Sequence, residues 1–264
     1  MKLTSFKYKT RKGPDYRHGE QMTFIDIKKT FNLGNIRIGK WVTREEKELA
    51  ANVIFDSLAD LAFILALPPE AIGLRGTLNL AFGTGGQMGV QAHYAPYRRE
   101  LALAKNAGAG ALAHEFWHAF DHYISDKAFE IDTPFNSSSL PLFASDCWLK
   151  NKTIKPHPLN ERLMAIFDSA LLSENGLDKS DYVARSVKAD LVLSKNYYAQ
   201  PTEMMARAFE SVIEYCAEIN NAYLVSGTLN NDVIKLYPDL THRHRVHEAL
   251  LAYFKPLGMA LTRL

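Results

Sequence analysis

The amino-acid sequence predicts an α+β fold that is predominantly helical, and three observations lead to this class. Several long segments carry apolar residues at helical spacing. Only residues 77–82 (TLNLAF) and 98–104 (RRELALA) have the composition of short strands. The chain has 264 residues, 23% of them charged, which suits one sizeable core without disulfide or metal staples.

Composition and terminal sequence exclude several classes of protein. The formal net charge of +2 is too small to indicate nucleic-acid binding. Cys147 and Cys216 form no CxxC pair, which excludes a zinc ribbon or dithiol site and favours free thiols. The N-terminus lacks an apolar signal core, and the most apolar segment, 53–67, is too short to span a bilayer and is broken by Asp56 and Asp60. We therefore expect a cytoplasmic protein with no membrane contact.

Residues 1–40 are basic and show little periodicity, so we expect an N-terminal arm followed by one domain over 41–264. A solvated arm is favoured over a nucleic-acid contact, because charge clusters are most often solvated. The cations of this stretch are Lys2, Lys7, Lys9, Arg11, Lys12 and Arg17.

The first long helix is expected from Thr43 to the two prolines at 68 and 69. Thr43 and Glu46 fit a capping box, and the prolines end the helix. The glycine-rich stretch 83–89 between the two predicted strands matches no phosphate-binding motif, so we interpret it as a turn.

The second half of the sequence predicts mostly helices. A helix over 105–126 has Asn106 as its expected cap, and a loop-rich connection is expected over 125–158. Four further helices are predicted at 158–172, 178–193, 200–219 and 244–254.

The motif His114-Glu115-Phe-Trp-His118 lies inside the 105–126 helix. Residues four apart share one helix face, so both imidazoles can bind one metal ion. Glu115 is rotated by about 100° from His114, a position that suits a general base acting on water at a metal. Histidine ligands with an open position favour Zn²⁺. The alternative, satisfied polar residues in a buried helix, is less favoured because three such groups are costly to bury.

A third protein ligand must come from elsewhere. His122 is excluded, because on a straight helix it lies about 12 Å from His114 along the axis. His242, His244 and His247 belong to the expected exposed start of a helix. Glu203 lies at the start of the 200–219 helix and is a candidate third ligand. An acidic residue in the first turn of a helix is also common without any metal, so spacing alone favours the two interpretations equally.

These residues together resemble the zincin metallopeptidases of the gluzincin type. Residues 103–123 (LAKNAGAGALAHEFWHAFDHY) are similar to zincin-like domains of bacterial large polyvalent proteins. The stretch from Ile36 to Tyr123 resembles bacterial proteins of the CLCA-X family. Anthrax lethal factor shares the HExxHAxD pattern and a later ExxAxAF, which starts here at Glu203.

The resemblance implies a zincin-like fold with a small sheet packed on the HExxH helix, and it makes Glu203 the favoured third ligand. The lethal-factor catalytic tyrosine falls at Asn196, so either Tyr197 or Tyr198 is expected to support an oxyanion. Arg207 stands where that family has an acid. The expected supporting residues around the site are Asp121, Arg207 and Glu210. Arg207 would pair with Asp121 or Glu210, and Asp121 would orient His118 or else solvate the helix end.

The expected function is zinc-dependent hydrolysis of peptide bonds, with Glu115 as general base. The zincin plan makes the 98–104 strand a candidate edge strand that pairs with an extended peptide, although a strand paired on both edges remains open. The alternative function is an inactive zincin-fold protein that binds DNA or a mobile-element protein, which the basic arm would serve.

Overall fold

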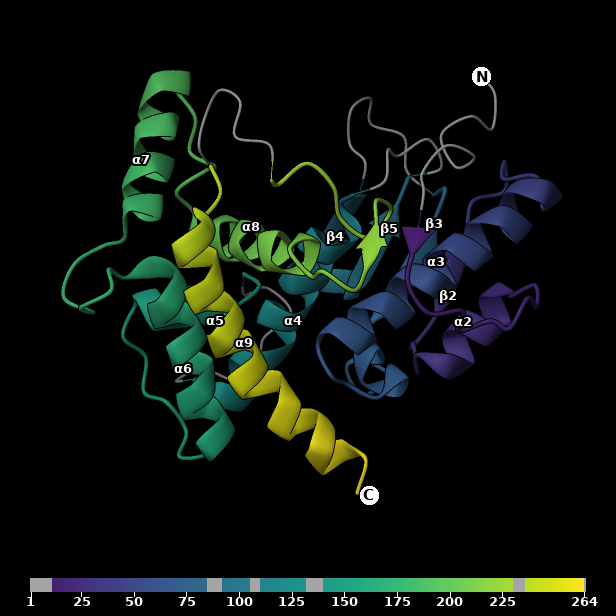
Figure 1. The fold of residues 1–264 in the computed structure, drawn as a ribbon, viewed down its shortest axis with the longest axis horizontal. Helices are drawn as coiled ribbons and strands as arrows, with labels where there is room; N and C mark the ends of the chain where they lie inside the picture. The colour runs from purple at the N-terminus through teal and green to yellow at the C-terminus, as the bar shows by residue number, and fades with distance from the viewer. Residues whose placement is uncertain (1–10, 85–91, 105–109, 132–139, 230–235, 264) are drawn as a thin grey trace.

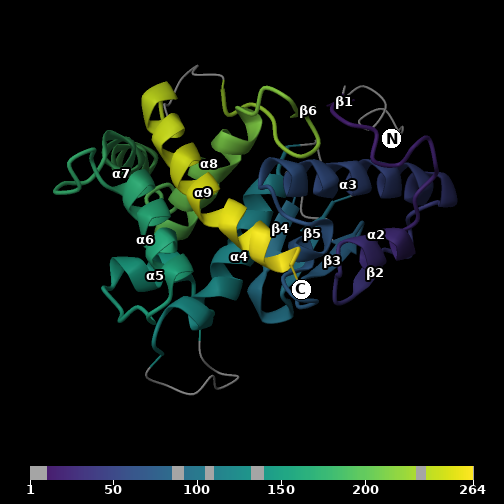
Figure 2. The same ribbon diagram turned by 60° about the horizontal axis from the view of Figure 1, so that its bottom comes forward.

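The computed structural model describes residues 11–84, 92–104, 110–131, 140–229 and 236–263, and it has the predicted α+β, predominantly helical fold. Helices α4 and α8 lie centrally, with the sheet, α2 and α3 on one side and α5, α6 and α7 on the other (Figures 1 and 2). Among the described residues no helix is long and apolar enough to cross a membrane. The helical elements are α2 (Phe24–Thr30), α3 (Arg44–Ile64), η1 (Pro69–Gly73), η2 (Pro96–Arg98), α4 (Leu112–Ala128), α5 (Ala144–Leu149), α6 (Pro158–Leu171), α7 (Asp181–Leu193), α8 (Pro201–Glu214) and α9 (Leu240–Leu261).

The main sheet has the strand order β2-β3-β5-β4, in which β4 is antiparallel to β5 and the other pairs are parallel. Its strands are β2 (Ile36–Ile38), β3 (Asn79–Phe82), β4 (Ala92–Ala95) and β5 (Glu100–Leu103), while β1 (Arg11–Lys12) pairs with β6 (Asn220–Asn221).

The predicted 98–104 strand corresponds to β5, and of the two possibilities left open it is the strand paired on both edges. It lies between β3 and β4, and all four of its residues are buried, as expected of an apolar run covered on both faces. Strand β4 is one of the two edge strands of this sheet, with β2 at the other edge, and the sequence did not predict it.

Helix α3 begins at the predicted capping box. Thr43 Oγ1 accepts from Glu46 N at 3.3 Å, and Glu46 Oε2 accepts from Thr43 N at 2.8 Å. Both acids that interrupt its apolar face are buried and paired: Asp60 with Arg11 at 2.7 Å and Asp56 with Arg17 at 2.9 Å. A buried carboxylate needs such a partner, so these two ion pairs hold the segment that carries Arg11 and Arg17 against α3.

The expected N-terminal arm is therefore wrong for the described part of residues 1–40. Besides the two arginine pairs, Ile27, Phe31 and Leu33 are buried in the main core, and β2 belongs to the main sheet. Residues 1–10 lie outside the described part of the chain.

Helix α4 begins at Leu112, later than predicted, and Ala111 is its N-cap residue. The expected cap, Asn106, lies outside the described residues. The stretch predicted to be loop-rich contains the end of α4 and the short helix α5. Cys147 on α5 is buried, Cys216 is half-buried, and both are free thiols, as predicted.

Helix α9 is longer than predicted and continues past Pro256. Proline has no N–H, so the carbonyl of Ala252 loses its usual partner within the helix. Arg162 on α6 donates to that carbonyl at 2.7 Å, which satisfies it and ties α6 to α9.

Candidate metal centre

Aromatic packing holds α4 against α8. The buried rings of Trp117 and Phe116 lie 5.0 and 6.3 Å, centroid to centroid, from that of Phe209. Offset and tilted aromatic pairs of this kind contribute beyond their buried area. The contact brings the first turn of α8 to the HExxH turn of α4.

His114, His118 and Glu203 form a group that could hold a metal ion. Each offers one ligand atom, and these atoms all lie within 4.8 Å of one another. Glu203 Oε2 is 3.3 Å from His114 Nε2, and Glu203 Oε1 is 3.4 Å from His118 Nε2. Glu203 Oε2 is buried and has no hydrogen-bond partner among the described residues. A buried carboxylate whose two oxygens each lie near an imidazole nitrogen offers the kind of donor set that zinc binds in catalytic sites.

Glu210 contacts the other nitrogen of the His114 ring. The distance from His114 Nδ1 to Glu210 Oε1 is 3.0 Å, and the Tyr237 hydroxyl donates to the same oxygen at 3.1 Å. A carboxylate on one ring nitrogen orients the other toward a metal. Glu210 was expected beside the site as a possible partner of Arg207, and its contact with His114 was not predicted. Burial opposes a charge on His114, but its contacts with Glu203 and Glu210 outweigh burial and raise its pKa to about 10.

Glu115 points beside the ligand group and takes no part in it. Its Oε2 accepts a hydrogen bond from the backbone N–H of Tyr94 on β4 at 2.7 Å. The unpaired edge of β4 thus meets α4 at Glu115, the residue expected to act as general base. A recess of about 340 Å³ opens here and is lined by Ala92, His93, Tyr94, His114, Glu115, His118, Phe143, Tyr197, Thr202 and Glu203.

The two candidate tyrosines occupy different places. Tyr197 lines the recess, where burial and the neighbouring Glu203 carboxylate raise its pKa above the ordinary value. Tyr198 lies outside the recess, with its ring 5.6 Å from the guanidinium of Arg207. Asp190 positions both, because it accepts from the backbone N–H groups of Tyr197, Tyr198 and Ala199.

The expected roles of Arg207 and Asp121 need correction. Arg207 donates to the backbone carbonyls of Tyr198 and Leu236, and it forms no ion pair with Asp121 or Glu210. Asp121 is fully buried, so it does not solvate a helix end. Its two carboxylate oxygens accept from the backbone N–H and the hydroxyl of Ser145 at 2.8 and 2.6 Å, and among the described residues neither oxygen is hydrogen-bonded to His118, which it was expected to orient. Burial raises the pKa of Asp121 to about 6. Neither side chain could be assigned from sequence, because their partners lie on other elements.

His122, His242 and His244 are not members of the metal group, whereas His93 on β4 lines the same recess. His122 Nδ1 lies 2.8 Å from the Tyr94 hydroxyl, and its ring packs 5.4 Å from that of Phe143. Burial lowers the pKa of His122 to about 4, which keeps it neutral at physiological pH. His242 Nε2 contacts the carbonyl of Ser169 at 2.8 Å, and the exposed His244 lies 3.6 Å from Glu248.

Several residues at the site gave no signal in the sequence. Tyr94, Phe143 and Tyr237 stand in no helical or strand register with the HExxH motif. Tyr94 contacts Glu115 and Phe143 packs near His118, while Tyr237 contacts Glu210; each contact arises only when the chain folds against α4 and α8. A motif search therefore had no means of finding them.

Residues 189–261 match the family model described as large polyvalent protein-associated domain 1. The matched segment includes α8, with Glu203, Arg207 and Glu210, and all of α9. Helix α4 and its two histidines lie outside the match. It supports the expected link with the large polyvalent proteins over this segment. No curated protein and no solved structure gives a significant match to the chain.

Proposed function

We propose that this protein is a zinc-dependent peptidase of the zincin type, acting on a peptide or protein. The observation that carries the proposal is the convergence of His114, His118 and Glu203, with Glu115 directly beside them. Bound zinc would supply Lewis acidity toward a carbonyl oxygen and would acidify water.

Glu115 has the position of a general base. One carboxylate oxygen is held by the backbone N–H of Tyr94, which orients the group and leaves the other oxygen for a proton. The carboxylate would take a proton from the attacking water and return it to the leaving amine nitrogen. Tyr197 lines the same recess, where its hydroxyl would donate to the oxyanion that develops on the scissile carbonyl.

Strand β4 is the proposed docking edge for an extended substrate. Among the described strands it pairs only with β5, and three of its four residues line the recess. A substrate strand that pairs with this edge would pass beside the metal group. Nucleic acid is not part of the proposal, because Arg11 and Arg17 of the basic stretch are already paired with acids of α3.

Elemental analysis combined with a peptide-library digest tests the proposal. Protein purified without chelator should carry zinc and cleave peptides, and Glu115→Gln should carry zinc without cleaving. The control is Glu48→Gln, which alters an exposed glutamate of α3. Failure to bind zinc even after reconstitution would overturn the proposed metal, and equal cleavage by Glu115→Gln would overturn the proposed base. Zinc-loaded wild-type protein that cleaves no peptide in the library would favour an inactive zincin-fold binding protein.

A further inference from the structure

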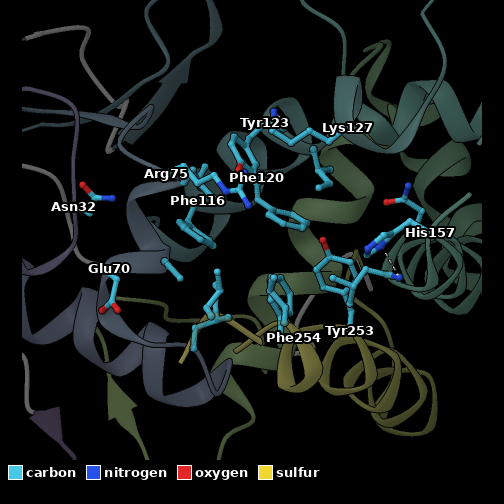
Figure 3. A pocket seen from close by; sticks show the side chains of 18 of the residues that line it. Asn32, Glu70, Arg75, Phe116, Phe120, Tyr123, Lys127, His157, Tyr253 and Phe254 are labelled. Carbon is cyan, nitrogen blue, oxygen red and sulfur yellow. Dashed lines mark hydrogen bonds between the residues drawn. The ribbon is translucent and has the colours of Figure 1, made fainter. Parts of the chain in front are cut away.

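A second cavity, larger than the metal recess, lies on the other side of α4. Its volume is about 590 Å³, within the range of roughly 300–1,000 Å³ typical of small-molecule sites. Figure 3 shows the aromatic rings of α4 and α9 that form much of its wall. The main apolar contributors are Phe116, Phe120, Tyr253, Phe254, Leu257 and Leu74.

The cavity is separate from the metal recess, and the two share no lining residue. Phe116 follows His114 by two residues, which places the two side chains about 200° apart around the helix. The same helix therefore lines one site with metal ligands and the other with phenyl rings. A ligand of this cavity would therefore be distinct from a peptide bound at the metal centre.

The charged groups around the cavity are mainly cations. Arg75, Lys127 and Lys155 line it, against one carboxylate, that of Glu70. Lys127 and Lys155 already donate to Asp126, through its carboxylate and its backbone carbonyl respectively. Within the described part of the chain, no hydrogen bond or ion pair engages Arg75, which leaves its guanidinium available to a ligand.

The backbone that carries Arg75 has an unusual conformation. Leu74 and Arg75 have φ values of 50° and 58°, in the left-handed region that non-glycine residues rarely adopt. Such conformations cost energy and are concentrated at functional sites and ligand clamps. Here they follow the end of η1 and bring a buried leucine and an exposed arginine to the same cavity.

We propose that this cavity binds a small apolar carboxylate, with its hydrocarbon part between the rings of α4 and α9 and its carboxylate on Arg75. Burial of the hydrocarbon would drive binding, since apolar area removed from water is the main favourable contribution. Arg75 would give selectivity for an anion, because a guanidinium binds a carboxylate through paired hydrogen bonds. The proposal is independent of zinc and of peptidase activity.

Calorimetric titration with dodecanoate tests the proposal, and dodecan-1-ol serves as the uncharged probe of equal chain length. Dodecanoate should bind the full chain with one site, and more tightly than dodecan-1-ol. Arg75→Ala should weaken dodecanoate about three- to tenfold and leave dodecan-1-ol unchanged, because one partly solvated charge pair is lost. Arg44→Ala, which removes an exposed arginine at the start of α3, should change neither.

Two cavity-filling variants locate the site. Ala71→Phe on η1 and Leu257→Phe on α9 place extra volume into the cavity, and each should abolish dodecanoate binding while the helical circular dichroism stays unchanged. Two variants are used so that one remains if the other fails to fold. No binding of dodecanoate to the wild type, equal affinity for the alcohol, or undiminished binding by a folded cavity-filling variant would each overturn the proposal.

Discussion

The backbone N–H of Tyr94 donates to the carboxylate of Glu115 across 2.7 Å, and the Tyr94 hydroxyl lies 2.8 Å from His122 Nδ1. One residue of the sheet edge thus contacts α4 at two points, one turn before and one turn after His118. This arrangement ties the position of β4 to the orientation of Glu115.

Glu115→Gln should retain zinc and lose hydrolysis by a factor of about 100 to 10,000, because an amide cannot accept the proton of water. The amide oxygen can still accept from Tyr94, so the recess should keep its shape. Zinc content and initial cleavage rates measure the two effects. If Glu115→Gln lost its metal as readily as His114→Ala, Glu115 would have to be reassigned as a ligand.

Zinc should bind with one ion per chain, since one group of three ligands is present among the described residues. His114→Ala, His118→Ala and Glu203→Gln should each abolish stoichiometric binding. Glu210→Gln should weaken the affinity about 10- to 100-fold, because Glu210 orients His114 without joining the ligand group. Competition with a zinc-binding dye would measure these affinities. Unaltered affinity in Glu203→Gln would contradict the ligand assignment.

Tyr197→Phe should lower kcat about 100-fold at unchanged zinc content, as expected when one oxyanion donor is lost. Tyr198→Phe is the matched control, because Tyr198 is the neighbouring residue but lies outside the recess. Steady-state kinetics on a cleavable peptide compare the two. A larger loss in Tyr198→Phe would reverse the assignment.

His122 should make the fold sensitive to acid. Its pKa is about 4 in the folded protein against the ordinary 6.5, so the unfolded chain binds more protons between these values. The contribution is fully present above pH 6.5 and is lost as pH falls toward 4. We expect a loss of about 1–2 kcal/mol over this window, which His122→Gln should remove. Urea unfolding across pH 4–7 measures this pH dependence of stability. The control is His244→Gln, which alters an exposed histidine. Equal pH dependence in the wild type and both variants would contradict the prediction.

Arg11→Met should destabilise the fold by about 2–4 kcal/mol, because Asp60 would stay buried as a charge and, within the described part of the chain, would keep only its hydrogen bond from Asn221. The double substitution Arg11→Met with Asp60→Leu should recover much of this loss, since no buried charge remains. Urea unfolding at neutral pH compares the variants. A single substitution without effect would mean that residues near Arg11 are not fixed on α3 in solution.

Helical periodicity in the sequence determined those features that depend on local spacing. His114 and His118 share a face because they are four residues apart on one helix, and the start of α3 follows from its capping box, whereas the helix ends at Ile64, before the prolines predicted to end it. Glu203 was a different case. Spacing favoured equally its role as a metal ligand and its role as an ordinary acid in the first turn of a helix. Only the resemblance to known metallopeptidases favoured the ligand role.

Only the tertiary structure decided the contacts between residues far apart in the chain. Asp56 and Asp60 were recognisable as interruptions of an apolar helix, and Arg11 and Arg17 as members of a basic cluster, but nothing in the sequence joined them. The same holds for the edge position of β4, for Ser145 on Asp121 and for Glu210 on His114. Local spacing repeats every turn and can be read from one segment. A partner on another element depends on how whole elements pack. A buried charge or hydrogen-bonding group needs a complementary partner, and the packing decides which group lies close enough to be that partner.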